Sequence, residues 1–254
     1  MLLVSSSRRN FVRNAGAGLG LLSLPNLFTN SKSPDKKFKV VCVGGHPDDP
    51  ESGCGGTLAR FANAGHAVTI IYLTSGEAGI PGKSHDEAAA IRTKEAREAC
   101  KILQTKPVFA GQIDGSTIVN GDWIKKLQEL VAAEAPDIVF THWPIDSHPD
   151  HQAASLLTIQ TWMRTNKPFD LYFFEVCQGS QTMTFRPTDF VDISATQEQK
   201  KKAVYCHVSQ NAASIYEASD CNHALMEKFR GAEIGVAAAE GFVRMTGRNN
   251  GMVI

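Results

Sequence analysis

Residues 40–49 read VVCVGGHPDD, an apolar run followed by two glycines, a histidine, a proline and two aspartates. The apolar run Val40–Val43 predicts a buried strand, because strands covered on both faces read as continuous hydrophobic segments. Open α/β sheets bind their ligands at the carboxyl ends of the strands. The sequence therefore places His46, Asp48 and Asp49 at the edge of a sheet where such folds build their sites.

A second polar cluster repeats this arrangement about a hundred residues later. Residues 148–151 read HPDH and come soon after another apolar run, Ile138–Phe140. Two His/Asp clusters at the ends of two strands of one sheet can meet as a single metal site. The pair of clusters therefore indicates a metal-dependent hydrolase.

Apolar runs and helical periodicities alternate along the chain from residue 38. Strands are expected at 40–43, 67–73, 107–110, 137–141 and 171–176, and helices at 52–64, 86–103, 122–134, 149–163, 198–207 and 222–229. Residues 184–192 could add an edge strand, Asp122 is expected to cap its helix, and the chain beyond Asn211 is otherwise expected to be irregular. This order predicts an α/β fold: a Rossmann-like three-layer α/β/α sandwich with a mostly parallel sheet.

The composition is that of an ordinary globular protein. Of 254 residues, 43% are hydrophobic, and the formal net charge is zero, which gives no indication of a nucleic-acid partner. The six cysteines form no C-x-x-C pair, which argues against a structural zinc knuckle or a redox motif. A homo-oligomer is compatible with this composition.

The N-terminal segment differs from the rest of the chain. Arg8-Arg9 is followed by Phe11 and by the mildly apolar stretch 15–24, a pattern that resembles a twin-arginine export signal. That stretch is too short for a stable membrane span. The expected organisation is a signal over 1–30, a linker over 31–37 and a single domain over 38–254, with export to the periplasm or outside the cell. The alternative is a basic arm on a cytoplasmic protein.

The spacing within the two clusters suits a catalytic metal site. Asp48 and Asp49 are adjacent and so point to different sides of the chain, one free for a metal and the other for substrate. His148 and His151 are three apart and face the same way on a helical turn, and Asp150 could fix the tautomer of one imidazole. Two histidines and one carboxylate, with a position left for water, are the ligands of a catalytic zinc ion.

These motifs resemble those of the LmbE-like, PIG-L type N-acetylglucosaminyl deacetylases. The matching segments are HPDD at 46–49, GCGG at 53–56, TSGE at 74–77, RTKE at 92–95, HPDH at 148–151 and HVSQ at 207–210. The resemblance runs from about Lys39 to Asn211. One departure concerns the glutamate that usually follows the first cluster: this chain has Pro50 there, with Glu51 one place later.

The resemblance implies a role for each residue of the first cluster and for the last histidine of the second. It implies His46, Asp49 and His151 as zinc ligands. It implies Asp48 as the general base that takes a proton from the attacking water.

The remaining implied roles belong to the second cluster and to one arginine. His148 would stabilise the oxyanion or protonate the leaving amine, oriented by Asp150. Arg92 would contact substrate, although an exposed ion pair with Glu95 is the alternative. The other histidines are expected to lie on the surface or in packing positions: His66, His85, His142, His207 and His223. For His142, the alternative is that it lines the site together with Trp143.

The resulting hypothesis is a zinc-dependent hydrolase that removes the acetyl group from an N-acetylated amino sugar or glycoconjugate. A metal-dependent amidase acting on a non-sugar amide is the first alternative. The second is a nucleotide-binding domain without enzymatic activity that uses Gly53–Gly56 as a phosphate loop. That segment lacks the G-x-G-x-x-G spacing and follows two acidic residues, both of which disfavour it.

Overall fold

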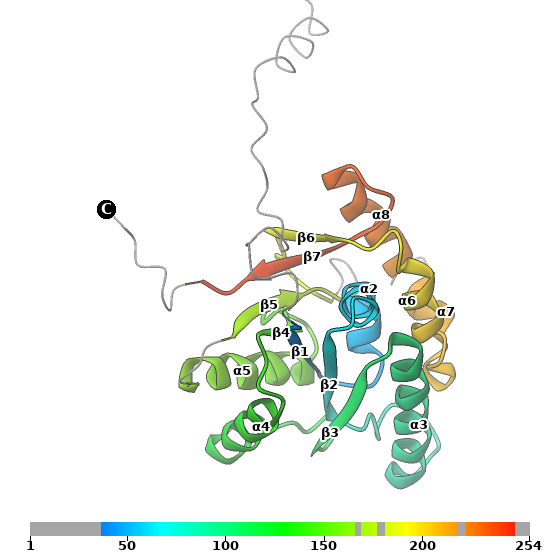
Figure 1. Cartoon of the computed structure of the whole chain (residues 1–254). Coiled ribbons are helices and arrows are strands. Elements are labelled where there is room, and N and C mark those ends of the chain that lie inside the picture. Colours follow the sequence, from blue (N-terminus) through cyan, green and yellow to red (C-terminus); the bar gives the residue numbers. More distant parts are fainter. Residues whose placement is uncertain (1–36, 166–168, 177–180, 218–221, 247–254) are drawn as a thin grey trace, which may run out of the picture. The chain divides into compact units, whose positions relative to one another are not determined.

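The computed structural model describes residues 37–165, 169–176, 181–217 and 222–246, and the chain from Lys37 onward is one compact unit. A seven-stranded sheet runs through it in the order β3-β2-β1-β4-β5-β7-β6 (Figure 1). Among the described strands, β7 runs opposite to the other six. The strands are β1 (Lys39–Gly44), β2 (Ala67–Thr74), β3 (Lys106–Gln112), β4 (Ile138–His142), β5 (Asp170–Phe174), β6 (Asp189–Asp192) and β7 (Ala239–Arg244).

Helices cover both faces of the sheet. The helices are α2 (Asp49–Asn63), α3 (His85–Leu103), α4 (Gly121–Glu134), α5 (Pro149–Arg164), α6 (Gln197–Val204), α7 (Ala212–Tyr216) and α8 (His223–Ile234), with a 3-10 turn at Val208–Gln210. Helices α4 and α5 pack together on one face, whereas α2, α3 and α6 pack on the other (Figure 1). Among the described helices, none combines the length and the apolar character that crossing a bilayer requires.

The strand order reverses between β1 and β4. The chain moves from β1 outward to β2 and β3, and then returns to place β4 on the other side of β1. In open α/β sheets this switch point leaves a crevice at the carboxyl ends of the two central strands. The two His/Asp clusters follow β1 and β4, so the topology brings both to the same crevice.

The strands beside the crevice are held in the centre of the core. Val41 pairs in register with Val139, and both side chains are fully buried. Continuous β-branched residues suit such strands, because helices cover both of their faces. This burial gives the two clusters a rigid base.

The expected fold class is confirmed, and the edge strand is present as β6. Two expectations were wrong. The last third of the chain contains the short helix α7 and the internal strand β7, where irregular segments were expected. Helix α4 begins after Asn120, whose side chain accepts a hydrogen bond from the Trp123 N–H, so Asp122 is not the cap. The twin-arginine motif and the segment that follows it lie outside the described residues.

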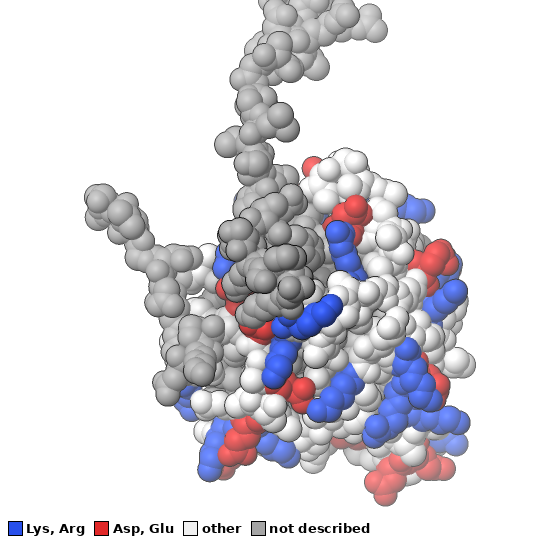
Figure 2. Space-filling model, viewed as in Figure 1, with Lys and Arg blue, Asp and Glu red and all other residues white. Residues whose placement is uncertain are grey.

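Lysine and arginine side chains are interspersed with aspartate and glutamate on the face shown in Figure 2. This mixture agrees with the zero net charge of the chain.

Candidate metal centre

The first cluster turns sharply between β1 and α2. Asp48 has a φ of 108°, a backbone conformation that strongly favours glycine and costs an ordinary residue about 1–3 kcal/mol. Its N–H donates to the Glu51 carboxylate at 3.2 Å, and Pro50 lies in the first turn of α2, where no N–H is needed. These local contacts hold the turn in its strained form.

The turn sends the two aspartates to different sides, as the sequence predicts. Asp49 is buried, with one carboxylate oxygen 3.1 Å from His46 Nδ1 and the other 3.2 Å from His151 Nε2. Asp48 faces away from them, and its carboxylate lies 3.1 Å from the Arg92 guanidinium. The Asp49 carboxylate therefore joins the two clusters, and Asp48 is left for another task.

Two carboxylates contact the ring nitrogen of His46 that does not face Asp49. Its Nε2 atom lies 2.9 Å from an Asp150 oxygen and 3.1 Å from an Asp114 oxygen. Carboxylates placed behind an imidazole in this way fix its orientation and increase its basicity toward a metal. Asp114 was not among the residues expected at the site, although it lies just after β3, at the same edge of the sheet as the two clusters.

His151 is supported in the same manner. Its Nδ1 atom lies 3.3 Å from an Asp146 oxygen and 3.1 Å from the Gln181 amide nitrogen. Behind it stacks the buried His142 ring, with centroids 4.0 Å apart, and His142 Nε2 accepts the Gly45 N–H. His142 thus supports His151 from behind, and neither Asp146 nor Gln181 had been singled out.

His148 is the one histidine of the two clusters that is only half-buried. Its Nδ1 atom accepts the backbone N–H of Asp150 at 3.2 Å, which leaves the proton of the neutral ring on Nε2. The ring lies 4.7 Å from that of His46, centroid to centroid. His148 can therefore present an N–H donor to the cavity.

Asp150 does not orient His148 through its carboxylate, which corrects the expectation from sequence. Its two oxygens accept hydrogen bonds from the Thr117 hydroxyl and the Gly115 N–H and meet His46 Nε2. The hydrogen bond from Asp150 to His148 comes from its backbone N–H. The reason is geometric: Asp150 lies in the first turn of α5, and its side chain is directed across the crevice to the other cluster.

Arg92 does not form the exposed ion pair with Glu95 that was the alternative for it. Its side chain is buried and donates to the Pro47 carbonyl as well as to Asp48. Glu95 instead accepts hydrogen bonds from the Ser209 N–H and hydroxyl.

Burial raises the pKa of Asp48 to about 6, against the opposing effect of Arg92.

Glu51 occupies a fully buried position behind the first cluster. Besides the Asp48 N–H it accepts the Tyr72 hydroxyl at 2.5 Å, and it lies 3.2 Å from His207 Nε2. Replacing the usual glutamate by Pro50 therefore leaves a carboxylate in contact with the turn, supplied one residue later. His207, expected on the surface or in a packing position, is a buried partner of this carboxylate.

The site contains several groupings suited to a metal ion. Ligand atoms within 4.8 Å of one another come from three sets: His46, His148 and His151; Asp49, His142 and His151; and His46, Asp114 and Asp150. The expected ligands His46, Asp49 and His151 are divided between the first two sets, and Asp49 contacts both histidines. A mixture of imidazole and carboxylate donors suits zinc and related divalent ions.

The charges around these groups also favour a cation. Burial disfavours a charged His46, yet its hydrogen bonds to three carboxylates raise its pKa well above the usual range. Burial likewise opposes the charged form of His151, but Asp49 and Asp146 raise its pKa to about 9. Both imidazoles lie in an excess of negative charge, which a divalent ion would compensate.

These side chains line a cavity of about 410 Å³. Every expected site residue except Asp150 is among its lining residues. The lining residues are His46, Asp48, Asp49, Ala78, Gly79, Arg92, Asp114, Gly115, His148, His151, Gln181 and Gln210. Its polar walls suit a small, hydrogen-bonding substrate.

Comparison with known proteins agrees with this geometry. Residues 41–162 match the family described as PIG-L, GlcNAc-PI de-N-acetylase. A diacetylchitobiose deacetylase of Thermococcus kodakarensis is 31% identical over 211 residues, which cover 78% of this chain and 79% of that enzyme. This chain belongs to the PIG-L family.

Two solved structures match this chain over most of its length. The N,N'-diacetylchitobiose deacetylase of Pyrococcus horikoshii matches with a TM-score of 0.74 and 26% identity, covering 96% of this chain and 95% of that one. A conserved protein of Thermus thermophilus matches with a TM-score of 0.69 and 30% identity, covering 82% of this chain and 95% of that one. The three-layer architecture is thus shared along most of the sequence.

Proposed function

We propose that this protein is a metal-dependent N-deacetylase that removes the acetyl group from an N-acetylated amino sugar or its conjugate. The observation that carries the proposal is the convergence of His46, Asp49 and His151 beside the ion pair of Asp48 with the buried Arg92. The two deacetylases named above act on diacetylchitobiose, and their similarity to this chain supports an amino-sugar substrate.

The expected metal ligands are His46, Asp49 and His151, and zinc is the ion that this donor set favours. A bound divalent ion would lower the pKa of a water molecule and polarise the acetyl carbonyl. The carboxylates behind His46 and His151 would hold both imidazoles in the orientation that binding requires.

Asp48 is the proposed general base. Its carboxylate borders the cavity, and Arg92 holds it by an ion pair that also fixes its direction. With a pKa of about 6 it is mostly ionised at neutral pH and can accept the proton of the attacking water. Arg92 acts here as a positioning residue for Asp48. It also lines the cavity, and we propose that it contacts the substrate there.

His148 is the proposed donor to the oxygen that becomes negative in the transition state. Its Nδ1 is occupied by the Asp150 N–H, so the Nε2–H is the hydrogen that it can offer. A preorganised donor of this kind acts where charge develops during acyl transfer. Asp150 contributes in a different way, by orienting His46.

Acetate release from a panel of N-acetylated sugars, with and without chelation of the metal, tests this proposal. We expect hydrolysis of N-acetylglucosamine-type substrates, loss after chelation and recovery on adding zinc. Release from non-sugar N-acetyl amides alone would favour the amidase alternative. Tight binding of a nucleotide without any hydrolysis would favour the alternative of a nucleotide-binding domain without enzymatic activity.

We also propose that residues 1–30 direct the protein out of the cytoplasm. The support is the sequence pattern alone, an arginine pair followed by a short apolar stretch. Replacing Arg8 and Arg9 together by lysine should leave the protein inside the cell, because the export receptor reads the arginine pair. Detection of the unaltered protein in the cytoplasm with residues 1–30 intact would refute the idea.

A further inference from the structure

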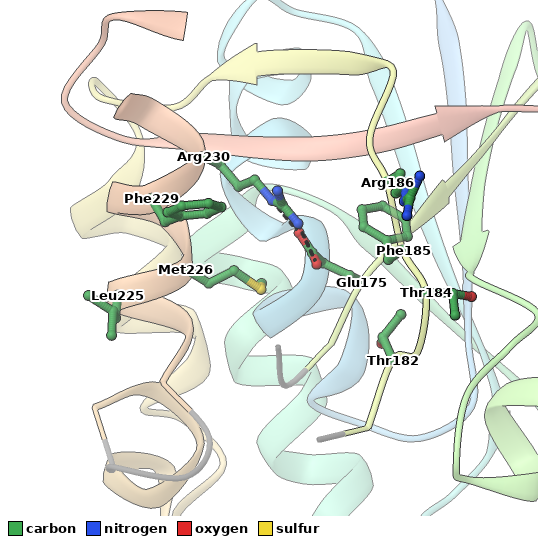
Figure 3. A pocket seen from close by; sticks show the side chains of 9 residues that line it. All are labelled: Glu175, Thr182, Thr184, Phe185, Arg186, Leu225, Met226, Phe229 and Arg230. Atoms are coloured by element: carbon green, nitrogen blue, oxygen red, sulfur yellow. Dashed lines mark hydrogen bonds and ion pairs between the residues drawn. The ribbon is translucent and has the colours of Figure 1, made fainter. Parts of the chain in front are cut away.

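A second cavity, of about 470 Å³, lies beside the candidate metal centre, between α8 and the segment that follows β5 (Figure 3). Its apolar lining comes from Phe185, Leu225, Met226 and Phe229. Leu225 and Phe229 are each 59% exposed. Single exposed apolar side chains are ordinary, but two that border the same cavity, with further apolar side chains inside it, mark a binding surface.

The buried polar groups of this cavity are already paired. Arg230 and Glu175 meet through two parallel contacts, of 2.7 Å at Nε and 2.9 Å at Nη2, seen as dashed lines in Figure 3. The Arg230 guanidinium also lies 5.3 Å from the Phe229 ring centre and 5.9 Å from that of Phe185. Because a bidentate pair satisfies both groups, what the walls offer an occupant is mainly apolar contact.

Only a thin wall separates this cavity from the metal centre. Gln181 lines the metal-centre cavity and contacts His151 Nδ1, whereas its neighbour Thr182 lines the apolar cavity. The Thr182 hydroxyl donates to Asp146 at 3.3 Å, and the same Asp146 oxygen lies 3.3 Å from His151 Nδ1. A single carboxylate therefore lies between an expected metal ligand and the apolar cavity.

We infer that the apolar cavity binds an aglycone, an aliphatic or aromatic group attached to the N-acetylated amino sugar. The acetyl group of that sugar is removed at the adjacent metal centre. This inference rests on the proposed function and narrows its substrate to a conjugate with an apolar part. The polar cavity of about 410 Å³ takes the sugar and its acetyl group, and the apolar cavity takes the group beyond it.

The position of the cavity favours an aglycone over a long acyl chain. An acyl chain begins at the carbonyl that reacts at the metal, so its pocket must open from the floor of the metal centre. Here the Gln181–Thr182 segment stands between the two cavities. The exposed Leu225 and Phe229 form an outer rim, so the occupant enters from outside, as a substituent that projects from the sugar would.

The test compares acetate release from N-acetylglucosamine glycosides that carry methyl, hexyl or phenyl aglycones, each as both anomers. We expect the intact enzyme to favour hexyl or phenyl over methyl by about tenfold in kcat/KM, the discrimination that an apolar pocket typically provides. Leu225→Ser with Phe229→Ser should remove this preference and leave the methyl glycoside rate within about twofold, since neither side chain borders the metal centre.

Two matched variants control for folding and for surface polarity. Leu156→Ser with Met163→Ser removes two apolar side chains of similar exposure, 45% and 56%, from helix α5, outside both cavities. We expect it to keep the preference. Leu225→Met with Phe229→Tyr keeps the apolar lining and should keep the preference as well.

Equal rates with all three aglycones, or a preference that survives in the Leu225/Phe229 serine variant, would overturn the inference while leaving the deacetylase function intact. A serine variant that instead loses activity on longer N-acyl chains would overturn it in favour of an acyl pocket. Absence of acetate release from every glycoside would refute the proposed function, and this inference would fall with it.

Discussion

The tripeptide His-Pro-Asp occurs twice beside the crevice, after β1 and after β4, and the two copies have different structures. Both histidines, His46 and His148, border the cavity, as Asp48 does, whereas Asp150 is buried and is not among the lining residues. Asp48 pairs with Arg92, whereas Asp150 pairs with His46 across the crevice. The two copies thus differ in whether their aspartate reaches the cavity.

The backbone explains this difference between the aspartates. Asp48 has a φ of 108° and precedes α2, so its side chain leaves the chain in a direction that a regular helix does not allow. Asp150 lies inside the first turn of α5, and there His148, not the aspartate, is the residue that flanks the helix start. A shift of two residues relative to the helix start thus decides whether the aspartate of the tripeptide reaches the cavity.

The largest effect should come from the residue that directly follows each copy, Asp49 or His151, because both are expected metal ligands. Asp49→Ala and His151→Ala should each lose the bound ion and fall to background activity, because two remaining ligands are too few to hold it. Elemental analysis of the purified variants measures the metal directly. Full metal content in both variants would show that the ion, if present, is held by other residues.

The next effect should come from the aspartate of the first copy. Asp48→Asn should keep the metal and lower kcat by roughly 10² to 10⁴, because the amide has nearly the same shape but cannot accept a proton. Metal content and kcat measured on the same preparation separate the two roles. The assignment fails if Asp48→Asn loses the ion while Asp49→Asn keeps both ion and activity.

The histidine of the second copy should follow. His148→Ala should keep the metal and lower kcat by about 10² to 10³, with KM nearly unchanged, because its donor acts on charge that develops only in the transition state. Steady-state kinetics with one N-acetylated sugar give both constants. A rise in KM at constant kcat would instead make His148 a residue that only binds substrate.

The aspartate of the second copy should have the smallest effect, and on a different quantity. Asp150→Asn should weaken metal affinity by about 10- to 100-fold, as expected when a carboxylate behind a ligating imidazole is removed. Competition with a chelator measures that affinity, and saturating metal should restore most of kcat. A loss of kcat that saturating metal does not restore would mean that Asp150 acts on His148 after all.

Much of this molecule could be predicted from local pattern. The strands and helices up to α6 follow from apolar periodicity, and the crevice follows from the strand-end positions of the two clusters. Strand β7 could not be predicted, because its segment Ala239–Arg244 mixes glutamate, glycine and arginine with apolar residues and its partners lie far away in sequence. Its pairing with β5 and β6, not its own propensity, makes it a strand.

The sequence by itself determined the residue types of the site and their order along the chain: the two histidine–aspartate motifs, the strands that precede them, and the departure at Pro50. Only the tertiary structure decided which groups meet. Asp114 and Asp150 at His46, Arg92 at Asp48, and Glu51 at His207 are contacts between segments 44 to 156 residues apart. Spacing along the chain fixes directions only within a turn or a strand, whereas the reversal of strand order between β1 and β4 places distant side chains in one crevice.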